Sequence, residues 1–349
     1  MIKQVRNGAA FSLPHPLEVE LAELLVEVIP CAEMVRYGKN GSDATSAAVR
    51  VARAYTGRDK IACCGYHGWH DWFVGTTTRA MGVPQTTRAL TLTFQYNGLQ
   101  SLERLFDGHH NEIAAVIMEP VGVVEPENDF LARVKELAHR HGAVLIFDEI
   151  VTGFRLGIGG AQAYFGVTPD LACFGKAMAN GFPLSAVVGC REIMELFDEV
   201  FVSFTFGGEA IALAAALATI NELRSEDVYH HLWNQGRRLQ DGFNRFAAQS
   251  GLADYCHCTG LPPHTVMMFT APEVADPLVL RSLLQQELIK RGILHLTGIN
   301  TCYGHSDQDV DITLAAYEQA LGVLSDAIKS GDPRAYLLGE PVRPVFRKP

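Results

Sequence analysis

Residues 113–150 read IAAVIMEPVGVVEPENDFLARVKELAHRHGAVLIFDEI, and this stretch decides the fold. The runs at 113–120 and 143–150 are nearly all apolar, which predicts two strands buried on both faces. Between them, 128–142 has the apolar spacing of a helix that ends at Gly142. DLACFG at 170–175 predicts a third buried strand. Buried strands alternating with helices indicate an α/β fold, with a mostly parallel central sheet and helices on both faces.

On the amino-terminal side, two further segments have helical spacing. PLEVELAELLVEV at 16–28 predicts an amphipathic helix that closes before Pro30. DATSAAVRVARAY at 43–55 predicts a second helix, with Asp43 in its first turn. KIACC at 60–64 predicts a short strand.

On the carboxy-terminal side, the Ala-rich stretch 210–224 predicts a long helix, and a region of different spacing follows it. That region predicts a smaller α+β unit with strands at 264–271 and 293–299, helices at 278–291 and 309–328, and an extended surface tail at 333–349. The expected organisation is an N-terminal helical segment (1–30), a large domain (31–220) and a small C-terminal domain (221–349).

Composition limits the class of ligand. The 349 residues are 48% hydrophobic and 19% charged, a balance that supports a large folded core. The net charge is −10 and no run of Lys or Arg is present, so neither nucleic acid nor an anionic membrane is an expected partner. Small molecules are the expected ligands.

Cysteine usage favours a reducing compartment. The eight cysteines lack the regular spacing of a disulfide framework, and Cys256-His257-Cys258 lacks a second pair to complete a metal site, so no metal is expected. No apolar run approaches the roughly 20 residues of a spanning helix, and the stretch after Met1 does not resemble a signal peptide. These features predict a cytoplasmic protein.

Two glycine and hydroxyl elements precede predicted helices. KNGSDA at 39–44 places Gly41 and Ser42 where backbone N–H groups and the helix dipole could bind a phosphate. The alternative is a simple helix cap. FTFGGEA at 204–210 is a second such element, in which Thr205 could reach another edge of a phosphate.

Two charged residues stand at the ends of predicted buried strands. Asp148 follows AVLIF, where an ionised carboxylate needs a cationic partner, and the alternatives are a helix cap or an ion pair with Arg155. Lys176 follows DLACFG, and a lysine in so apolar a run could supply the neutral amine of Schiff-base chemistry or could simply lie in solvent. Together they point to a carbonyl cofactor with a ring nitrogen.

GYHGWH at 65–70 supplies an aromatic element after a short strand. Tyr66 could stack on a flat ring with His67 beside it, and core packing is the alternative.

In order and spacing, these elements resemble the class III (ornithine-aminotransferase-like) family of pyridoxal-phosphate enzymes, most closely its glutamate-1-semialdehyde 2,1-aminomutase group. The resemblance runs from about residue 8 to about residue 325, and IFDEIVTGFR and FGKAMANGFPLSAVVG are its most specific motifs. It implies the PLP-dependent transferase fold type I, with pyridoxal 5'-phosphate as cofactor.

The resemblance also implies roles for individual residues. Lys176 would form the internal aldimine and Asp148 would contact the pyridinium nitrogen, and these two are the catalytic residues. Thr205 would reach the phosphate in the neighbouring subunit of a homodimer. Gly41 and Ser42 would hold the phosphate, and Tyr66 and Ile150 would pack on the two faces of the ring. His67 would lie beside the stacking Tyr66, and Glu119 would lie on the substrate side of the cofactor.

This chain differs from the family pattern at two places. Val124 stands at about the position of an Asn in the aminomutases, and the family's N-terminal portion before GAAFSLPHPLEVELAELL is missing. The implied function is an aminotransferase that passes an amino group from an amine donor to a carbonyl acceptor. The alternatives are the aminomutase, or a truncated and catalytically silent member that serves as a binding or assembly subunit.

Overall fold

The structure is a computed structural model that describes residues 1–270, 276–296 and 298–343. The chain divides into two compact units, one formed by residues 1–122 and 126–226 and the other by residues 123–125 and 227–349. Each unit has its own sheet and its own core.

The first unit is built on a seven-stranded sheet with the strand order β1-β7-β6-β5-β4-β2-β3. Neighbouring strands from β6 through β3 are parallel, whereas β7 is antiparallel to both β6 and β1. The predicted mostly parallel sheet is therefore confirmed. The strands are β1 (Met34–Gly38), β2 (Lys60–Cys64), β3 (Thr91–Thr93), β4 (Ile113–Met118), β5 (Val144–Asp148), β6 (Leu171–Phe174) and β7 (Ser185–Gly189).

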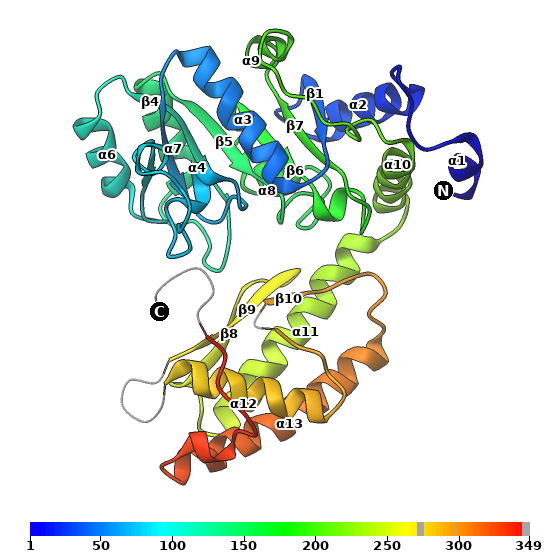
Figure 1. Ribbon diagram of the computed structural model, residues 1–349. Coiled ribbons are helices and arrows are strands. Elements are labelled where there is room, and N and C mark those ends of the chain that lie inside the picture. The colour runs from blue at the N-terminus through cyan, green and yellow to red at the C-terminus, as the bar shows by residue number, and fades with distance from the viewer. Residues whose placement is uncertain (271–275, 297, 344–349) are drawn as a thin grey trace. The chain divides into compact units, whose positions relative to one another are not determined.

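Helices cover both faces of this sheet (Figure 1). One face packs against α2 (Pro16–Val28), α6 (Leu99–Gly108), α7 (Phe130–Arg140) and α10 (Ala210–Ser225). The other face packs against α3 (Gly41–Thr56), α4 (Asp71–Val74) and α9 (Arg191–Met194). Shorter helices complete the unit: α1 (Ile2–Asn7), α5 (Gln85–Arg88), α8 (Gly160–Phe165), η1 (Lys176–Met178) and η2 (Glu195–Asp198).

The central strand β5 shows why unbroken apolar runs form this sheet. Val144 and Ile146 pack on the α3 side, whereas Leu145 and Phe147 pack on the opposite side. Side chains alternate along a strand, so both faces must be apolar when helices cover both. Full burial of one such side chain contributes about 1.5–3 kcal/mol. The same alternation places Asp148 on the α3 side of the sheet.

Local signals set the ends of the helices near the site. His15 caps α2, because its ring accepts from Leu17 N and its own N–H donates to Glu18. The helix predicted at 43–55 begins two residues earlier, at Gly41, and ends before Gly57, which has the left-handed φ of 67°. The early start places Gly41 and Ser42 in the first helical turn.

The second unit has a three-stranded antiparallel sheet in the order β10-β9-β8. Its core includes Phe243, Leu283, Tyr317 and Leu321, contributed by three helices. The elements are β8 (Cys256–Leu261), β9 (His264–Phe269), β10 (Gly298–Asn300), α11 (Val228–Gln249), α12 (Pro277–Lys290), α13 (Asp307–Lys329) and η3 (Pro333–Tyr336). The predicted smaller α+β unit is confirmed.

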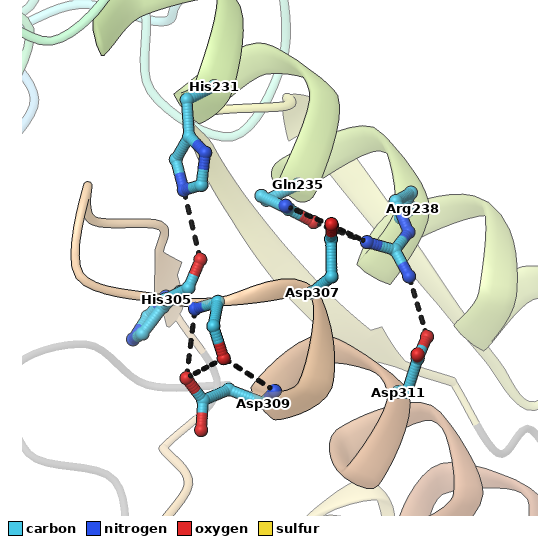
Figure 2. A network of polar contacts seen from close by, with 8 residues as sticks. His231, Gln235, Arg238, His305, Asp307, Asp309 and Asp311 are labelled. Carbon is cyan, nitrogen blue, oxygen red and sulfur yellow. Dashed lines mark hydrogen bonds and ion pairs between the residues drawn. The ribbon is translucent and has the colours of Figure 1, made fainter.

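Polar contacts join the start of α13 to α11, as Figure 2 shows. The Arg238 guanidinium contacts Asp307 and Asp311, each at 2.6 Å. Gln235 Nε2 donates to Asp307 at 2.7 Å, and His231 Nε2 donates to the His305 carbonyl at 2.9 Å. These contacts fix the loop that enters α13.

Two predictions for this unit were wrong in part. In the strand predicted at 293–299, the described residues 293–296 form no strand and β10 begins at Gly298. Leu294 and Leu296 are 93% and 69% exposed and so contribute little to the core. The tail predicted as extended forms the short helix η3 at 333–336. The strand predicted at 264–271 ends at Phe269, and residues 271, 297 and 344–349 lie outside the described residues.

Two further findings concern the whole described chain. All eight cysteines are free thiols. Among the described helices, none combines the length and the apolar character that crossing a membrane requires.

Candidate active site

A cavity of about 400 Å³ opens at the carboxyl ends of the parallel strands in the first unit. Its walls come from the segments that follow β1, β2, β4, β5 and β6. Because β7 is antiparallel to both of its neighbours, β1 runs in the same direction as β6, so all five segments emerge at one edge. Ligands of open α/β sheets bind at this edge.

Eight of the nine residues singled out from the sequence line this cavity: Gly41, Ser42, Tyr66, His67, Glu119, Asp148, Ile150 and Lys176. The ninth, Thr205, lies exposed in a turn at 205–208 and is not among the lining residues described. The fold therefore brings together side chains from five separate segments of the chain.

A buried aspartate–histidine pair forms one wall. His67 Nδ1 lies 2.8 Å from Asp148 Oδ2, and the residues are only 1% and 4% exposed. His67 Nε2 lies 3.1 Å from the Cys64 carbonyl, so both ring nitrogens face an oxygen. Asp148 Oδ1 also accepts from Ile150 N at 3.1 Å. One partner of the carboxylate is thus a histidine. The sequence predicted a cationic partner, with a helix cap or an ion pair with Arg155 as the alternatives.

The amino terminus of α3 forms a second wall. Asp43 accepts from the backbone N–H groups of Lys39 and Asn40, at 3.1 and 2.8 Å, which fixes the loop ahead of the helix. Gly41 and Ser42 lie in the first turn, where N–H groups have no partner within the helix. Gly68, at φ +101°, approaches so closely that a Cβ there would collide with Ser42 Oγ. This leaves a cradle of backbone suited to an anion.

Glu119 holds the loop that carries Tyr66. Its Oε2 accepts from Tyr66 N at 3.0 Å, and a Cβ on Gly65, which has a φ of +110°, would lie 2.6 Å from the same oxygen. Burial raises the pKa of the Glu119 carboxyl, and the nearby charge of Asp148 raises it further. Glu119 therefore positions the Tyr66 loop from the wall of the cavity.

Lys176 stands at the end of β6 with a φ of 41°, in the left-handed region. This conformation costs about 1–3 kcal/mol for a non-glycine residue and is typical of functional sites. Lys176 lines the cavity and begins the short helix η1.

The two neighbouring acids of IFDEI have separate surroundings. Asp148 lines the cavity, whereas Glu149 is fully buried and accepts from Thr152 Oγ1, Ala161 N and Gln162 N at 2.6–3.0 Å. Burial raises the pKa of the Glu149 carboxyl. Glu149 fixes the turn after β5, a role that the sequence did not predict.

Three lining residues were not predicted from the sequence: Lys39, Thr45 and Phe182. Thr45 Oγ1 donates to the His67 carbonyl at 2.9 Å and so ties α3 to the Tyr66 loop. Lys39 stands just before the glycine loop in KNGSDA, and this position in the sequence could have identified it as a lining residue.

A family model described as aminotransferase class-III matches residues 3–255. The chain belongs to the class III aminotransferases. Its membership of this family, and the predicted enzyme class, are thereby confirmed.

Among relatives in sequence, this class III chain is similar to a 3-aminobutyryl-CoA aminotransferase from Cloacimonas acidaminovorans (strain Evry). The two are 38% identical over 333 residues, which cover 92% of this chain and 79% of the relative. A glutamate-1-semialdehyde 2,1-aminomutase from Natranaerobius thermophilus is 40% identical over 294 residues, which cover 78% of this chain and 67% of the relative.

Similar solved structures confirm the predicted transferase fold. The FumI protein of Sphingopyxis sp. MTA144, in its PLP internal aldimine form, superposes with a TM-score of 0.87 at 28% identity, covering 95% of this chain and 81% of that one. An omega-transaminase from Sphaerobacter thermophilus gives a TM-score of 0.85 at 29% identity, and the superposition covers 92% of this chain and 81% of the transaminase.

Proposed function

We propose that this chain is a pyridoxal-phosphate-dependent aminotransferase, which moves an amino group between an amine or amino acid and a carbonyl substrate. One observation carries the proposal: Lys176, the Asp148–His67 pair and the amino terminus of α3 line a single cavity. Membership of the class III family supports it.

The residues present fit this cofactor. The cavity volume of about 400 Å³ lies within the usual range of about 300–1,000 Å³ for small-molecule sites. The cradle at Gly41 and Ser42 suits a phosphate, because the N–H groups of the first turn of α3 have no partner within the helix. Tyr66 and Ile150 supply two apolar walls for a flat ring, and the buried Asp148 carboxylate suits a protonated ring nitrogen.

When bound, pyridoxal phosphate supplies an electron-withdrawing ring that stabilises the electron pair left on a substrate carbon. Asp148 would keep the ring nitrogen charged, and His67 would hold that carboxylate in place through the 2.8 Å contact. Glu119 would keep Tyr66 against the ring through its contact with Tyr66 N. These residues would orient and polarise the cofactor ring, and they need not move during turnover.

Lys176 would carry the proton transfers. In the holoenzyme its Nζ would hold the cofactor, and a substrate amine would release it. The freed amine can act as a general base and take a proton from the carbon that bears the substrate nitrogen. It can then act as a general acid and donate that proton to a carbon of the cofactor. Its place at the end of β6 puts this group on the cavity wall.

An amine-donor panel tests the proposed function. The protein is loaded with pyridoxal phosphate, amine donors are added singly, and the visible absorbance of the bound cofactor is followed. We expect at least one donor to remove the band and a keto acid such as pyruvate to restore it. Failure to form the band, or a band that no donor changes, would contradict the proposal.

A second candidate is the glutamate-1-semialdehyde 2,1-aminomutase reaction. Relatives at 35–40% identity that bear this name favour it. Val124, which stands at about the position of the aminomutases' Asn, has an exposed side chain without an amide, and this favours the aminotransferase. Conversion of glutamate 1-semialdehyde with no other amino donor or acceptor would establish the aminomutase, and a requirement for a separate acceptor would exclude it.

We further propose a homodimer in which Thr205 reaches the cofactor phosphate of the neighbouring subunit. In support, Thr205 is exposed in a glycine-containing turn and is not among the described residues that line the cavity of its own chain. Inactive Lys176→Ala and Thr205→Ala chains, unfolded and refolded together, should regain activity, because mixed dimers contain one intact site. No recovery in demonstrably mixed dimers would contradict the shared site.

We also propose that residues 31–220 form the cofactor-binding domain. We further propose that the protein is located in the cytoplasm. All described lining residues of the cavity fall within 31–220. The eight free cysteines fit a reducing compartment. Cell fractionation with an antibody against the chain tests the location, and recovery in a secreted or membrane fraction would contradict it.

A further inference from the structure

A single ion pair joins the two segments on which the proposed phosphate contacts lie. Lys39 Nζ lies 3.4 Å from Glu209 Oε2, and the two side chains are 15% and 17% exposed. Lys39 stands in the loop between β1 and α3, just ahead of Gly41, whereas Glu209 directly follows the turn at 205–208. Neither member of this pair takes part in the proposed chemistry.

The backbone and the side chain of Lys39 are both held in place. The Lys39 backbone N–H donates to Asp43 Oδ2 at 3.1 Å, which ties the residue to the first turn of α3. The ammonium donates to the Pro183 carbonyl at 2.9 Å, in the segment that follows Lys176 along the cavity wall. The ammonium therefore has a fixed position beside the amino terminus of α3.

Glu209 fixes the other end of the pair. Its two oxygens accept from Ile211 N at 2.8 Å and from Ala212 N at 3.0 Å, so the carboxylate caps α10. Its own backbone N–H donates to the Phe206 carbonyl at 3.1 Å, within the turn that carries Thr205. The carboxylate is therefore connected directly to that turn.

The surroundings of the pair make this contact stronger than an ordinary surface ion pair. Exposed pairs contribute little, because water screens the charges and the side chains must be ordered. Here both side chains are mostly buried, and other hydrogen bonds already order each of them. The contact can therefore hold the loop before α3 and the turn at 205–208 in a fixed relation.

We infer that Lys39 and Glu209 form a positioning pair that sets the affinity of the protein for the cofactor phosphate. The pair holds the cradle at Gly41 and Ser42 in a fixed relation to the turn that carries Thr205. It acts through these two segments and makes no contact with the phosphate itself. The inference rests on the proposed function, in which both segments bind the phosphate. In the proposed homodimer the turn serves the neighbouring site, so each pair influences both sites.

Cofactor analogues with and without the phosphate test this inference. Glu209→Gln removes the charge that faces Lys39, keeps an oxygen that can cap α10, and leaves the bond from Lys39 to Pro183 in place. In calorimetric titrations of the whole chain freed of cofactor, we expect Glu209→Gln to raise the dissociation constant for pyridoxal 5'-phosphate by about tenfold, the loss expected for one hydrogen bond between charged groups. The value for pyridoxal, which lacks the phosphate, should change by less than about twofold, because distant and independent contacts are unaffected.

A double-mutant cycle separates the pair from the capping role of Glu209. Lys39→Met should weaken the binding of pyridoxal 5'-phosphate at least as much as Glu209→Gln does. Combining the two substitutions should add little to the loss from Lys39→Met, because both remove the same contact. Lys39→Arg keeps a cation opposite Glu209 and should retain most of the affinity.

Two matched variants control for the loss of any ion pair and of any capping carboxylate. Lys60 pairs with Glu112 at 2.5 Å and has a side chain that is 20% exposed, at the start of β2 and so at the sheet edge opposite the cavity. Asp276 caps α12 in the second unit by accepting from Leu278 N. Lys60→Met and Asp276→Asn should both leave the ratio of the two dissociation constants unchanged.

Equal losses for pyridoxal 5'-phosphate and pyridoxal in Glu209→Gln would indicate a general loss of structure and would overturn the inference. So would additive losses in the double variant, or a loss confined to Lys39→Met, which would mean that the lysine contacts the phosphate directly. If circular dichroism shows that Lys39→Met does not fold, Glu209→Gln and Lys39→Arg decide the matter alone. A wild type that binds no pyridoxal 5'-phosphate would instead refute the proposed function, so the two failures are distinguishable.

Discussion

Lys176→Ala is expected to lower turnover by roughly a hundred- to ten-thousandfold, the range found when a proton-transfer group is removed. The variant also lacks the amine that would hold the cofactor, so the visible band of the loaded protein should be lost. Lys176 is the lysine at the end of β6, held in the left-handed region on the cavity wall. Single-turnover absorbance measurements with an active donor check the rate.

A matched control separates this effect from the loss of any lysine. Lys329 is exposed at the end of α13, in the second unit, and Lys329→Ala should keep both the band and the rate. Turnover of Lys176→Ala within about tenfold of wild type would exclude Lys176 as the proton-transfer group.

Asp148→Asn is expected to lower turnover by about a hundred- to a thousandfold, as when one preorganised electrostatic contact to developing charge is lost. The amide keeps the shape of the side chain but removes the charge that would hold a proton on the ring nitrogen. It also replaces the carboxylate that faces the buried His67 ring at 2.8 Å, and weakening a buried hydrogen bond to a charged group costs about 1.5–3 kcal/mol. Both the rate and the midpoint of thermal unfolding should fall.

The neighbouring acid provides the control for Asp148. Glu149→Gln replaces a carboxyl group whose oxygens accept from Ala161 N and Gln162 N, outside the described cavity walls. We expect it to lower the unfolding midpoint while the absorbance band of the bound cofactor stays unchanged. If both variants reduced turnover equally at a temperature where both are folded, Asp148 would have no special electrostatic role.

Much of the first unit could be predicted because its strands are apolar on both faces. IAAVIM and VLIF are apolar throughout and are separated by a helix, so a buried parallel pair could be predicted from the pattern. The common place of Asp148 and Lys176 on the cavity could be predicted as well, because Asp148 ends β5, Lys176 follows the end of β6, and these two strands pair directly.

Other features depend on strand order, which no local pattern contains. His67 and Asp148 are 81 residues apart, and they meet because β4 alone separates β2 from β5. Lys39 lines the cavity because β1 pairs with β7 and so ends at the same edge of the sheet as the parallel strands. In the second unit, the apolar spacing at 293–299 predicted a strand whose leucines lie in solvent, since alternation alone does not reveal whether a core is present.

The central claim is that Lys176 holds pyridoxal phosphate in this cavity. Borohydride reduction of the cofactor-loaded protein fixes the cofactor to the amine that carries it, and peptide mass spectrometry then identifies that residue. We predict that the modified peptide contains Lys176. Modification at Lys39 or another lysine, or the absence of any modified peptide, would contradict the claim.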